Sequence, residues 1–345
     1  MLILTSCSIG KDNEEETNEF LINSIISPEI KINEEYYRGV LPYKRSPING
    51  TLSEIPNQLD SNHFELVLLE LAKRFYDPSV YIFQEGQVLG LEDIDALINA
   101  EKDSEYEGFL YSISEHNYLL KDGTLAGLVI GLVVSPQYYE KDENGEYKRD
   151  IYGAKVKKKY TDEEILEKSK SLVNELTTIV REKSEVPIYF GVMEAEITDM
   201  KVPGTFFLTG EVTKGEKSIY KWSDYNEAFL FLPADINQLN EEYGEVARGF
   251  THFKDDINQY VPRFAGITGL ARFVDNNLVE LTIEVYTEFD STVEVIQLTQ
   301  FAIAMIPKYF TTNTHISLYV SSIDEPKSIY IRDANGEDFM HIYKK

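Results

Sequence analysis

The hydrophobic residues of this chain fall into short runs that predict strands, separated by stretches with helical spacing. The longest apolar run is "LAGLVIGLVV", Leu125–Val134, which has the length and composition of a buried strand. It follows an acidic turn, "KDGT" at Lys121–Thr124, and that turn is preceded by the strand-like segment "GFLYSISEHNYLL". This order predicts a β-hairpin.

A second hairpin is predicted around "VDNN", Val274–Asn277, between "GITGLARF" and "LVELTIEVYT". Each hairpin is followed by a predicted helix that begins with a capping box, at Thr161–Glu164 ("TDEE") and at Ser291–Glu294 ("STVE"). Each helix has one apolar stripe, formed by Ile165, Leu172, Val173, Leu176 and Val180 in the first and by Val295, Ala302, Ile303 and Ile306 in the second.

A strand is predicted after each helix, at Pro187–Glu196 and at His315–Asp324. We therefore expect an α+β fold of two related repeats, each a mixed or antiparallel sheet with packed helices around a hairpin–helix–strand core. The predicted segments are a truncated signal peptide and lipobox at 1–7, an acidic tether at 8–32, repeat 1 at 33–200, a linker or bridging strands at 201–224, and repeat 2 at 225–345.

The first repeat contains an additional segment, "QYYEKDENGEYKRDIYGAKVKKKY", that has no counterpart in the second. The segment is polar and rich in tyrosine and lysine, so it is not suited to a core. We expect it to form an exposed hairpin or loop.

Composition and charge exclude several partners. The chain is 43% apolar and 12% aromatic, which is sufficient to fill the cores of a folded protein of 345 residues. Its formal net charge is −26, whereas binding to nucleic acid requires clustered lysine and arginine. The same charge disfavours adhesion of the whole chain to anionic lipid by charge alone. We expect an acidic, soluble surface and no nucleic-acid partner.

The N-terminus predicts lipid attachment. The segment "LTSC" matches a bacterial lipobox that ends at Cys7, the sole cysteine of the chain, and a polar, acidic stretch follows it. Cys7 would carry a thioether-linked diacylglycerol whose acyl chains hold the protein to the membrane. Only six residues precede Cys7 and none is basic, so we expect the signal peptide to be truncated in this sequence.

The sequence contains little that predicts catalysis. No nucleophile elbow, phosphate-binding loop or dinucleotide motif occurs, and lipid attachment would occupy the one thiol. The histidines do not form pairs with metal-ligand spacing; they are His63, His116, His252, His315 and His341. We therefore predict no catalytic residue, no metal and no cofactor, and an enzymatic role is disfavoured.

Two polar segments leave alternatives open. In "VYIFQEGQVL", Tyr81, Gln84 and Glu85 could contact a ligand, or they could be the solvated end of a strand. On the first interpretation the protein would be a cell-surface receptor for a small ligand, or a hydrolase, with a cleft near Glu85. The segments "DENGE" and "DANGE", which begin at Asp142 and Asp333, resemble the start of a calcium loop, but a type I′ hairpin turn is the simpler interpretation.

Taken together, the lipobox cysteine, the acidic tether, "EEYYRGVLPYKRSPING" (Glu34–Gly50), "YIFQEGQVL" and the two α+β repeats resemble the CamS family of lipoproteins from Gram-positive Firmicutes. The family's members are sex-pheromone precursors, whose signal peptide releases a small hydrophobic heptapeptide from the residues just before the lipidated cysteine. The resemblance implies that the last six positions of this peptide are Met1, Leu2, Ile3, Leu4, Thr5 and Ser6.

The resemblance also implies a location and partners. The mature protein would be held at the extracellular face of the cell membrane by the lipid, with palmitate among its acyl groups, on Cys7. The released peptide would bind a pheromone receptor on other cells. No activity of the mature domain is implied; we expect it to have a non-catalytic binding or structural role, and its ligand is unknown.

Overall fold

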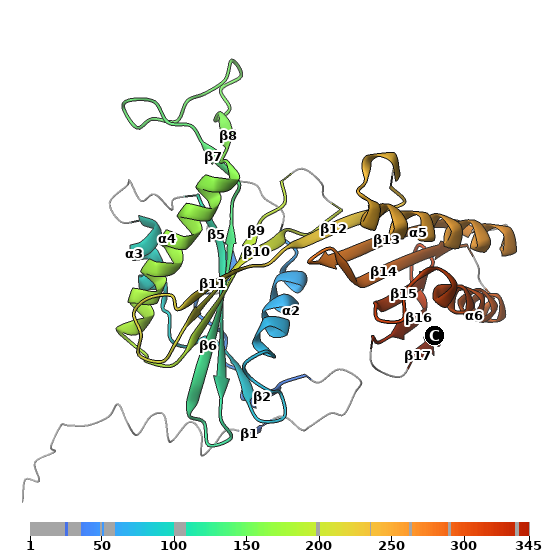
Figure 1. The fold of residues 1–345 in the computed structure, drawn as a ribbon, viewed down its shortest axis with the longest axis horizontal. Helices are drawn as coiled ribbons and strands as arrows, with labels where there is room; N and C mark the ends of the chain where they lie inside the picture. The colour runs from blue at the N-terminus through green and yellow to red at the C-terminus, as the bar shows by residue number, and fades with distance from the viewer. Residues whose placement is uncertain are drawn as a thin grey trace, which may run out of the picture.

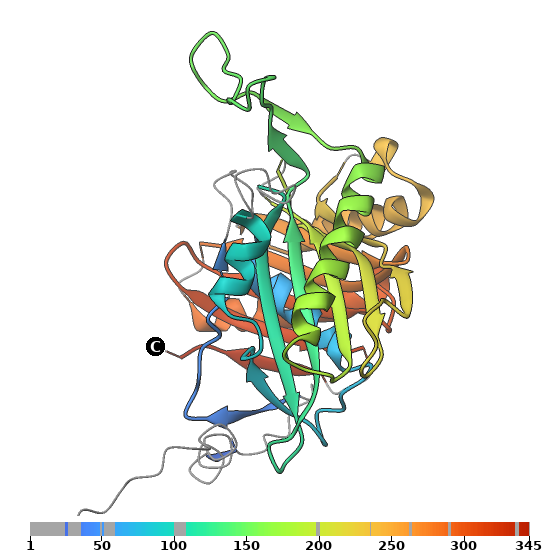
Figure 2. The same cartoon turned by 90° about the vertical axis from the view of Figure 1, so that its left-hand side faces the viewer.

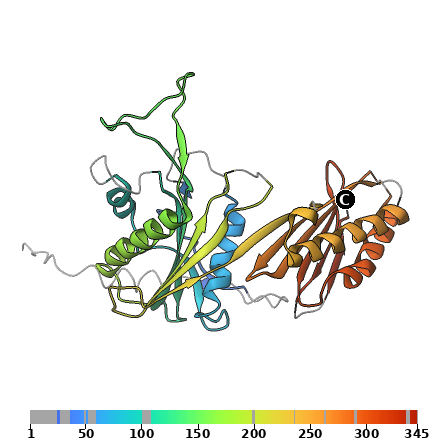
Figure 3. The same cartoon turned by 45° about the horizontal axis from the view of Figure 1, so that its top comes forward.

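The computed structural model describes residues 25–26, 36–48, 50–51, 59–99, 108–197, 201–234, 236–261, 264–288, 291–334 and 338–344. The fold is α+β, as predicted, and its two large sheets lie side by side (Figure 1, Figure 3). The elements of the first half are β1 (Ile25–Ile26), β2 (Arg38–Leu41), β3 (Gly50–Thr51), α2 (Ser61–Ala72), β4 (Ile82–Glu85), α3 (Leu91–Asn99), β5 (Leu110–Leu119), β6 (Leu125–Val134), β7 (Gln137–Tyr139), β8 (Lys157–Lys159), α4 (Asp162–Arg181), β9 (Ile188–Glu194), β10 (Thr205–Val212) and β11 (Lys221–Asp224).

The second half forms the other large sheet and its two helices. Its elements are β12 (Glu227–Leu232), the 3₁₀ turn η2 (Ile236–Gln238), α5 (Glu241–Tyr260), β13 (Phe264–Val274), β14 (Asn277–Thr287), α6 (Thr292–Tyr309), β15 (His315–Ser321), β16 (Pro326–Arg332) and β17 (Phe339–Ile342). The strand order among the described residues is β1-β2-β4-β5-β6-β9-β10-β11 in the first sheet, where β3 also pairs with β5, and β12-β13-β14-β15-β16-β17 in the second.

The first sheet is covered on both faces. Leu128, Ile130 and Leu132 of β6 pack in one core with α3 and α4, while Val129 and Val133 of the same strand pack in another core with α2. Figure 2 shows α3 and α4 on the face that is turned away from the second sheet. Burial on both faces explains why β6 is apolar at nearly every position instead of alternating.

Both predicted hairpins are confirmed. β5 pairs antiparallel with β6, and β13 pairs antiparallel with β14. The second turn is tight: its central residues Asp275 and Asn276 both have positive φ, 50° and 63°, as a type I′ turn requires. Asparagine and aspartate tolerate this conformation better than other residues that carry a Cβ. The residue types at the turns therefore predicted the hairpins correctly.

Only one of the two predicted capping boxes forms. At α4 the Thr161 hydroxyl accepts from the backbone N–H of Glu164 at 3.2 Å, and the Glu164 carboxylate accepts from the N–H of Thr161 at 2.7 Å. At α6 the helix does begin after Ser291, but the side chain of Ser291 makes no capping hydrogen bond, so this prediction was wrong. The first turn of α6 is closed by the backbone bond from Val295 N–H to the Ser291 carbonyl at 3.1 Å.

The apolar stripes of these helices face the cores as predicted. All five predicted positions of α4 are buried, and in α6 Val295, Ala302 and Ile306 are buried while Ile303 is half-buried. The stripe of α4 packs on the first sheet, and α6 packs beside α5 on the second. The helical period of 3.6 residues therefore correctly predicted which face of each helix packs on its sheet.

The two sheets share part of their connectivity. β6, α4 and β9 form a parallel crossover unit after a hairpin, and β14, α6 and β15 do the same. The sheets also differ, because α2 covers a second face of the first sheet, whereas the described core of the second sheet packs with α5 and α6. The origin of the two halves as copies of one unit stays a prediction.

The stretch predicted as a linker or bridging strands, 201–224, supplies β10 and β11 at one edge of the first sheet. The chain then enters β12 of the second sheet through Tyr225 and Asn226, and Figure 3 shows these strands leading from one sheet to the other. The predicted insertion forms the separate two-stranded sheet β7–β8, which confirms an exposed hairpin.

Candidate functional site

The N-terminal residues predicted to carry function, Cys7 and the segment from Met1 to Ser6, lie outside the described residues. Lipid attachment at Cys7 and release of the preceding peptide therefore stay predictions. None of the helices in the described part of the chain is long and apolar enough to span a membrane.

Glu85 lies at the end of β4, where its carboxylate is held by groups of the same chain. It accepts hydrogen bonds from the Tyr43 hydroxyl and, at 2.6 Å, from the backbone N–H of Ser46. The hydrogen bond to Glu85 raises the pKa of Tyr43 to about 12. Glu85 thus stabilises the loop after β2, with its oxygens engaged by protein donors.

Tyr81 and Gln84 do not converge with Glu85 on a common cleft. Gln84 is paired with Asn117 of β5, and it points to the opposite face from its neighbour Glu85 because side chains alternate along a strand. The Tyr81 ring packs edge-on against Tyr76, with 5.3 Å between ring centroids. The structure therefore places the three predicted ligand-binding residues in three different environments.

The group that organises this region is Glu115 of β5, which no sequence pattern predicted. Glu115 is fully buried, and its carboxylate accepts from the backbone N–H groups of Gln87, Val88 and Leu89 at 3.0, 3.0 and 2.8 Å. Burial raises the pKa of Glu115, although these N–H bonds oppose the shift. The sequence signal was an acid within "LYSISEHNYL", a strand that is buried at every position.

Gly86 lies directly against this buried carboxylate, and its N–H donates to the Glu115 carbonyl at 2.7 Å. A Cβ at position 86 would lie 2.4 Å from the Glu115 Cβ, closer than non-bonded carbon atoms approach. The segment "QEGQVLG" therefore has glycine at position 86 because Glu115 fills the space beside it.

We expect Gly86→Ala to lower the free energy of unfolding by about 1–3 kcal/mol, because the added methyl group must displace Glu115 from its three N–H donors. Chemical denaturation followed by circular dichroism measures the change. Gly266→Ala is the matched control, since a Cβ there meets no atom within 4 Å, and its effect should be below about 0.5 kcal/mol. Equal effects of the two substitutions would contradict the packing described for Gly86.

A second buried polar cluster joins the two sheets. Arg272 of β13 donates from Nε to the Glu227 carboxylate of β12 at 2.6 Å, and from Nη2 to Glu70 of α2 at 3.0 Å and to the Tyr225 hydroxyl at 3.2 Å. Glu227 also contacts His63 Nε2 of α2 at 3.2 Å. Helix α2 belongs to the first sheet and β12 and β13 to the second, so this cluster ties the halves together (Figure 1).

The charges in this cluster compensate one another away from water. Burial disfavours the ionised form of Glu227, but the hydrogen bond and charge of His63, the charge of Arg272 and the N–H of Phe206 hold its pKa below the ordinary value. Burial likewise acts to lower the pKa of Arg272, and the charges of Glu70 and Glu227 raise it above its ordinary value. Both groups are therefore ionised at neutral pH, and the cluster is a structural junction between the sheets.

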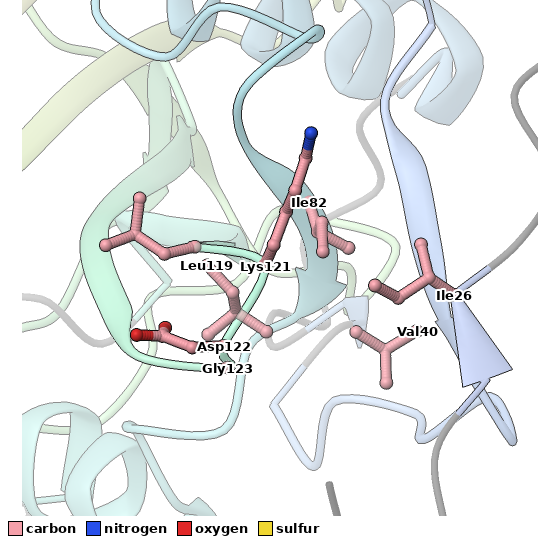
Figure 4. A pocket seen from close by; sticks show the side chains of 8 residues that line it. Ile26, Val40, Ile82, Leu119, Lys121, Asp122 and Gly123 are labelled. Atoms are coloured by element: carbon pink, nitrogen blue, oxygen red, sulfur yellow. The ribbon is translucent and has the colours of Figure 1, made fainter.

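An apolar pocket of about 230 Å³ lies beside the turn between β5 and β6 (Figure 4). Ile26, Val40, Ile82 and Leu119 supply aliphatic walls, and Lys121 and Asp122 are the charged groups among its lining residues. The lining includes none of Tyr81, Gln84 and Glu85, and a second, wider pocket beside α6 and β17 includes none of them either. Neither pocket therefore coincides with the cleft predicted near Glu85.

Within the described part of the chain, no group of histidine, cysteine, aspartate and glutamate side chains is arranged to hold a metal ion. Asp142 uses its Oδ1 atom to accept the N–H groups of Asn144 and Glu146, and so it fixes a turn. Only Gly145 in this turn has positive φ, 82°, so the predicted type I′ geometry was wrong. The other predicted loop begins at Asp333, and most of it lies outside the described residues.

The chain is similar to known proteins over nearly its whole length. A family model described as CamS sex pheromone cAM373 precursor matches residues 43–338. The solved structure of a sex pheromone precursor from Lactobacillus salivarius subsp. salivarius UCC118 is 22% identical, with a TM-score of 0.78, and the match covers 94% of this chain and 100% of that one. No curated protein sequence matches the chain significantly.

A second solved structure, the C-terminal domain of the sex pheromone staph-cAM373 precursor from Staphylococcus aureus, is 21% identical with a TM-score of 0.66. That match covers 82% of this chain and 96% of the other. At 22% and 21% identity, these two structures show only that the fold is shared. The family model shows the family, because it matches residues 43–338, well over half of the sequence. The chain belongs to the CamS family of sex pheromone precursors.

Proposed function

We propose that this protein is a lipid-anchored, extracellular precursor whose signal peptide yields a peptide pheromone ending at Ser6. The observation that carries the proposal is the family match over residues 43–338 in a chain whose sole cysteine follows "LTS" at the N-terminus. The family relates the chain to pheromone precursors, and the position of Cys7 supplies the processing site.

The chemistry of Cys7 and its neighbours supports both steps. The thiolate sulfur attacks the glyceryl carbon of a phospholipid; the carbon–oxygen bond to the headgroup phosphate breaks, the phosphate leaves with the electron pair, and a thioether to diacylglycerol forms. Water then hydrolyses the amide bond between Ser6 and Cys7, which gives the carboxylate of Ser6 and the free amine of Cys7 and separates the anchored protein from its signal peptide. Small side chains at Thr5 and Ser6 fit the binding cleft of a peptidase that holds its substrate extended. The apolar residues Leu2, Ile3 and Leu4 suit a peptide that enters a hydrophobic receptor pocket.

The mature domain fits a binding or structural role. Its buried acidic groups, Glu115 and Glu227, both accept hydrogen bonds from protein donors, and Glu85 is engaged by Tyr43 and Ser46. A catalytic carboxylate must face a substrate in an accessible cleft, and the two pockets described here contain none of these groups. These contacts disfavour the hydrolase alternative that uses a cleft near Glu85.

The anchor is tested by labelling cells that express the complete precursor with radioactive palmitate. We expect the protein to incorporate label and to fractionate with membranes, and the Cys7→Ala variant to lose both properties, because the chain has no other thiol. His315→Ala, a substitution in the second sheet, is the control for expression and should retain the label. A Cys7→Ala protein that is still labelled and still held in the membrane fraction would overturn the anchor.

A further inference from the structure

Residues 137–159, called here the finger, project beyond the rest of the molecule in all views of the fold (Figure 1, Figure 2). β7 and β8 form its base, paired from Gln137 with Lys159 to Tyr139 with Lys157. Further out the chain makes two successive turns, each closed by an isolated bridge, Lys141 with Tyr147 and Arg149 with Lys155. The finger therefore ends in two hydrogen-bonded turns.

The two turns have the same construction. In the first, Asp142 Oδ1 accepts from the N–H groups of residues 144 and 146 at 2.8 and 3.0 Å, and Gly145 has φ of 82°. In the second, Asp150 Oδ1 accepts from the N–H groups of residues 152 and 154 at 2.8 and 2.9 Å, and Gly153 has φ of 83°. The aspartate and the glycine set the backbone geometry, and the two positions between them are free to vary.

The side chains at these free positions differ sharply. The first turn carries Glu143 and Asn144, which suit an exposed tip. The second carries Ile151 and Tyr152, which are 90% and 87% exposed. Because the first turn forms without apolar residues, the fold does not require this pair at the tip of the second. Two adjacent large hydrophobic side chains on a projecting turn are costly to leave in water, and a contact surface is the physical reason to retain them.

The charge around the second turn is opposite to that of the whole protein. The finger contains seven basic and five acidic side chains, and six of the basic ones lie in residues 147–159 with a single acidic one, whereas the chain has a net charge of −26. Tyr152 and Lys159 are seven positions apart, which spans at most about 23 Å of extended chain. The Debye length at physiological salt is about 8 Å, so the tip is screened from much of the acidic surface. The finger can therefore approach an anionic surface that repels the rest of the molecule.

We propose that the finger inserts Ile151 and Tyr152 into the interfacial region of an anionic lipid bilayer while its lysine and arginine side chains contact lipid phosphates. Two side chains bury far less area than the roughly 1,200 Å² of a stable protein–protein interface, but shallow insertion needs only a small apolar tip. Isoleucine and tyrosine suit this depth. Arg149 donates to the Gly153 carbonyl at 2.7 Å and the Lys155 amine lies over the Tyr147 ring at 4.0 Å, so both cations are held beside the turn, where they can attract anionic lipid. This contact is independent of lipid attachment at Cys7.

The test uses the full chain with Cys7→Ala, which has no acyl anchor and no cysteine. Binding to vesicles of equal phosphatidylglycerol and phosphatidylcholine is measured by flotation, and we expect it to weaken at high salt and to be absent on phosphatidylcholine alone. Ile151→Ser/Tyr152→Ser should reduce binding at least about tenfold, through loss of buried apolar area. Glu143→Ser/Asn144→Ser, in the matching turn, should not reduce it.

An environment-sensitive fluorophore locates the contact. Attached to Cys in an Ile151→Cys variant, it should shift to shorter wavelengths with phosphatidylglycerol vesicles, and attached in an Asn144→Cys variant it should not. Circular dichroism confirms that each variant is folded. The proposal is overturned if the Cys7→Ala protein does not float with these vesicles, if both double-serine variants bind equally, or if the label at 144 shifts as much as the label at 151.

Discussion

Arg272→Met is expected to lower the free energy of unfolding by about 3–5 kcal/mol, the largest effect of any single substitution considered for this protein. Methionine keeps an unbranched apolar stem but has no charge, so the variant leaves the Glu227 carboxylate buried, with none of its side-chain surface exposed and without its guanidinium partner. The bonds from Arg272 to Glu70 and to the Tyr225 hydroxyl are lost as well. Denaturation in urea measures the change, and limited proteolysis shows whether the junction between the sheets opens.

A surface ion pair of the same type supplies the control for this prediction. Lys308 of α6 contacts Asp256 of α5 at 2.8 Å, but the lysine is largely exposed, so Lys308→Met should change stability little. Glu227→Gln combined with Arg272→Met should recover part of the loss, because no buried charge then remains unpaired. If Arg272→Met and Lys308→Met were equally stable, the junction would not depend on the buried cluster.

The effect of Arg272→Met should also depend on pH. The folded state holds the pKa of Glu227 below its ordinary value of 4.5, so the stability from its ionised form is complete above about pH 4.5 and is lost as the pH falls through the lower, folded value. In the variant the carboxylate lacks Arg272 and protonates more readily. The difference in stability between the parent and the variant should therefore narrow below pH 4.5. Repeating the denaturation series at several pH values measures this change. If the stability difference between the parent and Arg272→Met stayed the same at every pH, Glu227 would be excluded as the source of the destabilisation.

Glu115→Ala is expected to have the second-largest effect, a loss of about 3 kcal/mol, the lower end of the cost of three unpaired donors. The substitution removes the acceptor of three backbone N–H groups, at Gln87, Val88 and Leu89, and a buried unpaired donor costs about 1–3 kcal/mol each. It also leaves a cavity under the segment that follows β4. Hydrogen exchange should show faster exchange at these three amides, and denaturation should show the loss of stability.

Two related substitutions make this prediction specific. Glu115→Gln keeps one acceptor oxygen and should have a smaller effect than Glu115→Ala. Glu85→Ala removes a carboxylate only about 30 residues away in sequence, but one with a single backbone N–H donor, and it should also have a smaller effect. If Glu85→Ala destabilised the protein as much as Glu115→Ala, the segment after β4 would be held mainly by the contacts of Glu85 with the loop after β2.

Local patterns predicted much of the fold. The two hairpins, the helix that begins at Thr161 and the strands after both helices depend on residues that are neighbours in sequence, so alternation, turn residues and capping residues were sufficient to find them. Ser291 shows the limit of this reasoning, because a suitable residue type at a helix start does not ensure that its side chain forms the cap.

The polar clusters depend on contacts that no local pattern contains. Arg272 and Glu70 are 202 residues apart in sequence, and Glu115 is 26 residues from the nearest amide it accepts, that of Leu89. Their pairing is decided by how the sheets and α2 pack. Glu85 has the sequence pattern of a ligand residue because it lies near a glycine at a strand end, yet Glu115, on a fully buried strand, is the residue that fixes residues 86–89.

The family membership rests on a match over residues 43–338, and it agrees with the resemblance carried by the lipobox, the segment Glu34–Gly50 and "YIFQEGQVL". The described residues explain how the large domain is held together. The proposed pheromone lies elsewhere, in the residues before Cys7. The finger adds a surface feature whose two turns share an aspartate and a glycine and differ at the two positions between them.

Mass spectrometry of the culture medium and of the purified membrane protein tests the proposed function most directly. Expression of the complete precursor should release a short apolar peptide that ends in Leu-Thr-Ser, and the mature protein should begin at Cys7 with the added mass of a diacylglyceryl group. Both products should be absent from the Cys7→Ala variant. A mature protein that begins at another residue, or that carries an unmodified Cys7, would contradict the proposal.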